Sequence, residues 1–82
     1  MNHPCQCCGN LTVSEAYDIC PVCYWEDDPS QAECPDCAGG ANGISLIEAK
    51  RNYNLFGACE ERLLRYVRPP HSEEIPQRKS EE

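Results

Sequence analysis

Cysteine is the residue type in this chain whose number and spacing can support chemistry. The 82 residues include eight cysteines, four of which form two Cys-x-x-Cys pairs, Cys5–Cys8 and Cys20–Cys23, separated by eleven residues. Two residues between cysteines allow one tight turn to direct both sulfurs at a common point, and two such turns complete a tetrahedron of thiolate ligands. Gly9 permits the positive φ that such a turn often needs. The spacing therefore predicts a four-cysteine metal site.

The type of ion follows from the ligand set. Four cysteine sulfurs leave no open coordination position, and a closed site is structural rather than catalytic. We expect Zn²⁺, although the same turns also suit iron. Two alternatives stay open: these cysteines are disulfide-bonded or free, or Cys20 and Cys23 form a catalytic redox pair. The redox alternative requires the pair at a helix N-terminus after a buried strand, whereas a short hairpin is expected here.

The remaining four cysteines allow a second metal site. Cys34-Pro35-Asp36-Cys37 has ligand spacing, and Cys7 and Cys59 would complete a second set of four. The alternative is that Cys34 and Cys37 are loop thiols without a ligand role, that Cys59 is a small core residue, and that Cys7 lies inside the first turn by chance. The sequence leaves one ion and two ions both open.

A chain of this size usually needs a metal ion or disulfide bonds to stay folded. Domains below roughly 70–80 residues seldom gain more than about 3–5 kcal/mol from apolar burial alone. The N-terminus lacks the basic and apolar segments of a signal peptide, and no stretch approaches the roughly 18 consecutive apolar residues of a membrane span. We therefore expect a cytosolic protein with reduced thiols, in which paired cysteines bind metal more often than they form disulfides.

Apolar alternation predicts two short strands between the cysteine pairs. Leu11–Val13 and Tyr17–Ile19 alternate apolar with polar residues and flank the turn-forming segment Ser14–Ala16. They are expected to pair as a zinc-ribbon-like β-hairpin with a Cys-x-x-Cys knuckle at each end. One metal ion would then fix the register of a hairpin that is scarcely stable alone.

Capping signals place the helices after the second knuckle. Asp28 before Pro29 predicts one helical turn over 29–33, and Ser45 with Glu48 predicts a helix over 46–56 that Gly57 ends. A second helix or helical turn is expected over 59–67. The fold class is thus a small metal-stabilised α+β domain, hairpin first and two short α-helices after it. It is expected to span 3–68, with a disordered polar tail over 69–82.

The motifs together resemble a known family. Cys5-Gln6-Cys7-Cys8-Gly9, Cys20-Pro21-Val22-Cys23-Tyr24-Trp25-Glu26-Asp27-Asp28, Gly39-Gly40-Ala41-Asn42, Ser45-Leu46 and Phe56-Gly57-Ala58-Cys59 are similar to the cysteine-rich CPCC family of small bacterial proteins, over residues 4–70. Gln6 departs from the proline of the motif that names the family. Cys34 and Cys37 are not both general features of it, which weakens the case for a second metal site. The resemblance implies no activity or substrate.

The acidic net charge of the chain disfavours some classes of function. The formal net charge is −7, and the basic residues are diluted among acidic ones, which makes nucleic acid an improbable partner. The leading hypothesis is a protein-interaction module with an acidic surface and a basic partner. The alternatives are a nucleic-acid-binding zinc ribbon and a thiol redox protein. No Ser/His/Asp, Walker-type or open-metal motif predicts an enzyme, and the sequence leaves the oligomeric state open.

Overall fold

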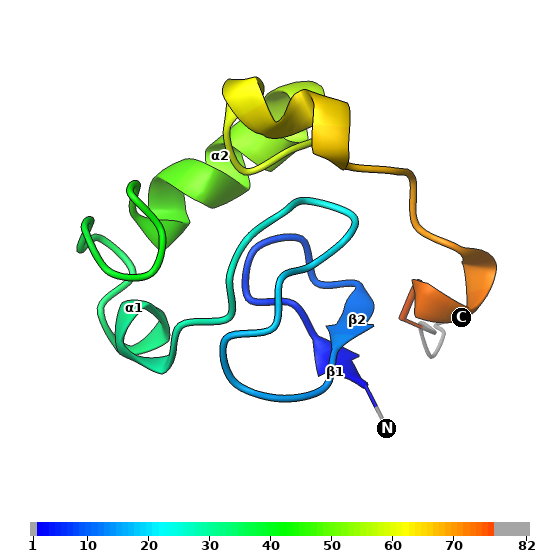
Figure 1. The fold of residues 1–82 in the computed structure, drawn as a ribbon, viewed down its shortest axis with the longest axis horizontal. Helices are drawn as coiled ribbons and strands as arrows, with labels where there is room; N and C mark the ends of the chain where they lie inside the picture. The colour runs from blue at the N-terminus through cyan, green and yellow to red at the C-terminus, as the bar shows by residue number, and fades with distance from the viewer. Residues whose placement is uncertain (1, 77–82) are drawn as a thin grey trace, which may run out of the picture.

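The fold is organised around two short loops at its centre. The computed structural model describes residues 2–76. In chain order the elements are β1 (His3–Pro4), β2 (Leu11–Val13), α1 (Pro29–Glu33), α2 (Leu46–Phe56), η1 (Glu61–Tyr66) and η2 (Ser72–Glu74). Helix α2 and the 3₁₀ helix η1 lie together over one side of the loops, and the chain then returns to place η2 beside β2 (Figure 1). Among the helices of residues 2–76, none has the length and apolar character needed to cross a bilayer.

The two-stranded sheet pairs different segments from those expected. Strand β2 was correctly predicted, but it pairs antiparallel with β1, through His3 and Val13, and not with residues 17–19. Ile19 instead forms a single antiparallel bridge with Glu26. The Asp18 carboxylate accepts hydrogen bonds from the amides of Ser14 and Glu15, at 2.9 and 3.1 Å, and so closes residues 14–18 into a turn. Each cysteine pair therefore lies in a loop between its own flanking segments.

The first helix begins where the capping residues predicted. The Asp28 Oδ1 accepts from the Ser30 amide at 2.9 Å, and Pro29 is the first residue of α1. The other carboxylate oxygen, Oδ2, accepts from the Ala41 amide at 2.8 Å. These bonds lower the pKa of Asp28, with the Ala41 amide contributing most. Asp28 thus caps α1 and also fixes the loop that leads to α2.

The second helix matches the predicted bounds, and the third helical segment is of another type. The Ser45 hydroxyl accepts from the Glu48 amide at 3.1 Å at the start of α2, and Gly57 ends the helix with φ 97°. Leu46 and Ala49 are buried on the face of α2 toward the core. The segment expected as a helix over 59–67 is the 3₁₀ helix η1.

A core of small and medium side chains surrounds the only tryptophan. The Trp25 side chain has no exposed surface, and its indole N–H donates to the Gln6 Oε1 at 2.7 Å. Val13 and Val22 are buried in the same cluster. In the described part of the chain every buried side-chain nitrogen or oxygen has a hydrogen-bond partner. The apolar core is therefore small, and the polar side-chain atoms buried around it are all hydrogen-bonded.

Part of the segment that the sequence assigned to a polar tail is a structured turn. The Arg68 guanidinium donates twice to the Glu74 carboxylate, each time at 2.9 Å, and the His71 amide donates to the same carboxylate at 2.8 Å. Arg68 lowers the pKa of Glu74 to about 2. Residues 77–82 of the predicted tail lie outside the described residues.

Replacing Glu74 by Gln is expected to loosen η2. The Glu74→Gln variant loses the charge that holds Arg68, so the amides of Glu74 and Ile75, which close η2, should exchange hydrogen faster by mass spectrometry. In the parent protein the ion pair contributes its full stabilisation above the ordinary glutamate pKa of 4.5, and this contribution is lost as the pH falls to about 2. Glu73→Gln, at an exposed neighbour, is the control, and equal exchange in both variants would contradict the assigned role.

Candidate metal centre

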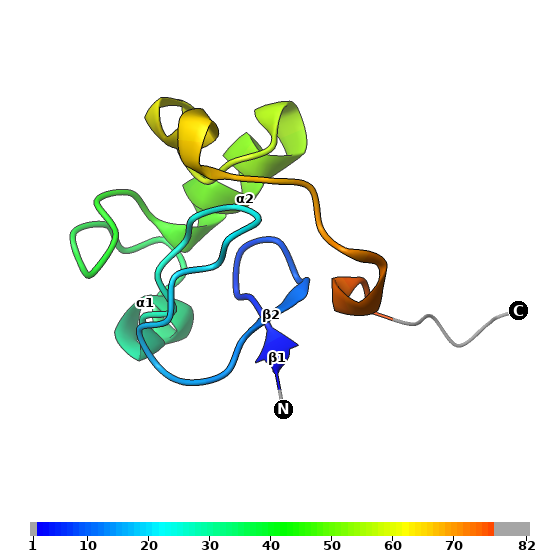
Figure 2. The same ribbon diagram turned by 45° about the vertical axis from the view of Figure 1, so that its right-hand side comes forward.

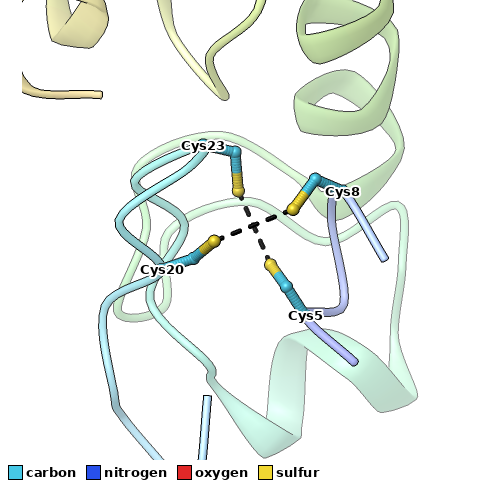
Figure 3. A group of neighbouring side chains, drawn as sticks. All are labelled: Cys5, Cys8, Cys20 and Cys23. Atoms are coloured by element: carbon cyan, nitrogen blue, oxygen red, sulfur yellow. Dashed lines mark hydrogen bonds between the residues drawn. The ribbon is translucent and has the colours of Figure 1, made fainter. Parts of the chain in front are cut away.

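The sulfur atoms of four predicted cysteines converge on one point. Cys5 and Cys8 come from the loop between β1 and β2, whereas Cys20 and Cys23 come from the loop between Ile19 and Glu26 (Figure 3). Their Sγ atoms all lie within 4.8 Å of one another, with 3.5 Å between Cys5 and Cys23 and 3.7 Å between Cys8 and Cys20. A tetrahedron with metal–sulfur bonds of about 2.3 Å has sulfur–sulfur edges of about 3.8 Å. The four residues therefore form a site of the size that one tetrahedral ion requires.

The two loops are built by the same set of hydrogen bonds. In each loop the first cysteine carbonyl accepts from the amide four residues later, its sulfur accepts from the amide two residues later, and its amide donates to the carbonyl five residues later. The bonds are Gly9 N to Cys5 O (2.9 Å), Cys7 N to Cys5 Sγ (3.4 Å) and Cys5 N to Asn10 O (2.8 Å), matched by Tyr24 N to Cys20 O (2.8 Å), Val22 N to Cys20 Sγ (3.3 Å) and Cys20 N to Trp25 O (3.0 Å). Backbone hydrogen bonds thus orient each pair of sulfurs.

Both loops end in a residue with positive φ. Gly9 has φ 82°, as the sequence predicted, and Tyr24 has φ 72° at the matching position of the second loop. A left-handed backbone is unfavourable for tyrosine. The Tyr24 ring stacks on Tyr66 of η1, with 5.3 Å between ring centroids. This contact, which the sequence did not reveal, ties η1 to the second loop.

Two side chains that the sequence did not single out also contact the sulfurs. The Asn10 Nδ2 donates to the Cys8 Sγ at 3.2 Å, and the Thr12 hydroxyl lies 2.9 Å from the Cys20 Sγ. Partners of this kind orient metal ligands and stabilise the thiolate form. The position of Thr12 in the middle of β2 was visible in the sequence, but its distance to Cys20 depends on how the two loops pack.

Four thiols this close form one coupled acid–base system. The interaction with Cys20 raises the pKa of the Cys23 thiol far above its ordinary value, and the interaction with Cys23 lowers the pKa of Cys20 far below it. The protons accordingly belong to the cluster rather than to single residues. Four adjacent thiolates repel one another strongly, whereas a divalent cation at their centre would attract all four. The donor set thus suits a soft metal cation.

The structure does not bring the other four cysteines together. Cys34 and Cys37 are joined by a disulfide in the loop after α1, which the sequence did not predict. Cys7 and Cys59 are buried thiols of the core, and burial raises the pKa of Cys59 to about 12. The Cys59 amide donates to the Cys23 carbonyl at 2.8 Å, which holds it beside the second loop. Within residues 2–76 the set proposed for a second metal site therefore does not assemble.

The fold and the site define a small cysteine-rich α+β protein with a four-sulfur centre. Residues 3–74 match the family model described as cysteine-rich CPCC, so the chain belongs to this family. The resemblance seen in the sequence is thereby confirmed. A search of curated proteins gave no match.

The motif that names the family has proline at the position of Gln6. In this chain the Gln6 side chain makes two hydrogen bonds. Its side chain accepts from the Trp25 indole at 2.7 Å and donates to the Asp28 carbonyl at 3.3 Å. A proline at this position would offer neither bond. Gln6 therefore connects the first cysteine loop to Trp25 and to Asp28, the residue that caps α1.

Replacing Gly9 by Ala is expected to destabilise the protein by about 1 kcal/mol, because alanine resists a positive φ. No atom lies within 4 Å of the position that the new methyl group would take, so the effect should be purely conformational. The free energy of unfolding, measured at a fixed metal-ion concentration, reports this change.

Gly43→Ala is the matched control for this substitution. Gly43 also has open space around it, but it does not have a positive φ. Equal stability of the two variants would mean that the first loop does not need its left-handed residue.

Proposed function

We propose that Cys5, Cys8, Cys20 and Cys23 hold one Zn²⁺ as a structural ion. The observation that carries this proposal is the convergence of four sulfurs within 4.8 Å of one another, with two separations, 3.5 and 3.7 Å, close to the edge of a zinc–thiolate tetrahedron. Four protein ligands leave no position for a substrate or an activated water, which supports a structural rather than a catalytic role. The alternative is iron bound by the same four cysteines, which are called the metal cage below. Elemental analysis of the purified protein distinguishes zinc from iron.

Removing the ion is expected to unfold the domain. Zinc binding contributes roughly 10–16 kcal/mol in zinc-finger peptides at neutral pH, more than a core of this size can supply. Excess chelator should abolish the cooperative melt seen by circular dichroism, and zinc should restore it. Acidification should act in the same direction, since protonated thiols do not bind the ion.

Single substitutions test which cysteines hold the ion. Cys8→Ser should lower the metal content and the thermal midpoint sharply, because it removes one of the four ligands. Cys37→Ser, outside the cage, should leave the metal content unchanged. A chelator-resistant melt, or equal metal content in both variants, would falsify the structural assignment.

We propose further that the metal-bound domain is a cytosolic protein-interaction module. Its net charge of −7, to which four thiolates and one divalent ion add two further negative charges, favours a basic partner over nucleic acid. A shallow groove of about 270 Å³, lined mainly by apolar side chains, lies between the end of α2 and the segment after η1; it is lined by Val22, Tyr53, Phe56, Gly57, Leu64, Val67, Arg68 and Pro69. A protein segment with an apolar side chain would complement this groove, and basic residues elsewhere in the same partner would complement the net negative charge of the domain.

Leu64 offers a test that does not disturb the core. Its side chain is 40% exposed and lines the groove, whereas Leu55 on α2 is 71% exposed and does not line it. A partner identified by cross-linking should bind the parent protein and Leu55→Ser alike, and it should bind Leu64→Ser at least tenfold more weakly. Its affinity should also fall as salt is added.

Two results would displace the interaction module. Tight binding of DNA or RNA at low salt would favour the zinc-ribbon alternative, in which the domain recognises nucleic acid. Turnover that depends on Cys20 and Cys23 in the metal-loaded protein would favour the thiol redox enzyme.

A further inference from the structure

The Cys34–Cys37 pair differs from every other cysteine in the described chain. These two residues form a disulfide, whereas the other six cysteines are free thiols. Cys37 is exposed and Cys34 is half-buried, in the loop that follows α1 and leads toward α2 (Figure 2). A disulfide with a solvent-exposed cysteine such as Cys37 is open to attack by thiolates from solution. The pair is thus chemically accessible in a way that the metal cage is not.

Hydrogen bonds hold the loop in place without help from the disulfide. The Cys37 amide donates to the Cys34 carbonyl at 2.9 Å, and the Ile47 amide, in the first turn of α2, donates to the Pro35 carbonyl at 2.9 Å. The Gln31 Nε2 donates to the Cys37 carbonyl at 3.1 Å. The two sulfurs should therefore stay close together after reduction, which favours re-formation of the bond.

A purely structural role explains the disulfide poorly. The ring that it closes spans a sequence separation of only three, and short rings constrain the unfolded chain least. Neither cysteine belongs to the buried core cluster. Breaking the bond should consequently leave the fold and the metal cage intact.

We propose that Cys34 and Cys37 form a second functional site, which undergoes reversible thiol–disulfide exchange with a low-molecular-weight thiol. This activity goes beyond the structural metal site and the interaction surface, and it does not rest on either. The reactant is a thiol of the glutathione class in the reducing direction and its disulfide in the oxidising direction.

The exchange proceeds in two balanced steps. A small-molecule thiolate attacks the exposed Cys37 sulfur, forms a mixed disulfide there, and breaks the Cys34–Cys37 bond; the electron pair goes to the Cys34 sulfur, which takes a proton from water. A second thiolate then attacks the small-molecule sulfur of the mixed disulfide and releases Cys37, which is protonated in turn. Two small thiols are oxidised to one disulfide while the protein disulfide is reduced to a dithiol.

Asp36 is expected to slow the first step. Its Oδ1 lies 3.5 Å from the Cys34 sulfur, so its negative charge opposes the thiolate that must leave. Asp36→Asn should therefore speed reduction of the disulfide severalfold without altering the metal content. Asp36 acts here as a positioning residue, since it modifies the leaving group and does not touch the incoming thiol.

The experiment is equilibration of the full chain, as purified, in glutathione buffers of graded reduced-to-oxidised ratio. After acid quenching and alkylation, peptide mapping should show Cys34 and Cys37 passing together from disulfide to dithiol across the series. The four cage cysteines should stay unmodified by glutathione and the metal content constant. A Cys34–Cys37 pair that keeps one redox state across the whole series would overturn the proposal.

Single-cysteine variants test the order of attack. Cys34→Ser lacks the resolving thiol, so Cys37 should accumulate a stable mixed disulfide with glutathione. Cys37→Ser should be modified much more slowly, because Cys34 is half-buried beside a carboxylate. Modification of both variants at equal rates would refute the assignment of Cys37 as the attacked sulfur.

Discussion

The convergence of four sulfur atoms is the constraint on which the rest of this small structure depends. Each loop brings two sulfurs to a shared point, and the mutual repulsion of thiolates there can be offset only by a cation or by retained protons. Val13, Val22 and Trp25, which are fully or almost fully buried, lie in or beside these loops and form a large part of the apolar core. Three of the four converging cysteines, Cys5, Cys20 and Cys23, belong to this same buried cluster, so the apolar core and the four-cysteine site are one unit.

Contacts outside the cage extend its order through the chain. Gln6 couples the first loop to Trp25 and to the start of α1, while Tyr24 couples the second loop to η1. Asp28 serves both α1 and the loop toward α2. A disturbance at the cage would thus reach each helix through one or two side chains, which is consistent with a single cooperative domain.

Features set by local geometry were predictable, and features set by packing were not. Cys-x-x-Cys spacing, the cap at Asp28 and the stop at Gly57 act within a few residues, so the sequence located the cage and both α-helices. The alternation of apolar and polar residues identified β2 but not its partner strand. Such a pattern indicates which face of a strand is buried, and it does not indicate which strand lies beside it. The Thr12 contact to Cys20 depends on how the two cysteine loops pack against each other. The Cys34–Cys37 pair was visible as a Cys-x-x-Cys spacing, but this spacing suits a disulfide as well as two metal ligands, so it did not decide between them.

The burial of Trp25 gives the protein an intrinsic optical probe. It is the only tryptophan in the sequence, its indole is fully shielded, and its N–H is bonded to Gln6, a residue that lies between two cysteines of the first loop. An indole in such surroundings emits at shorter wavelength than one in water. The wavelength of the tryptophan emission therefore reports whether the first loop keeps its folded contact with Trp25, without a dye or a chemical label.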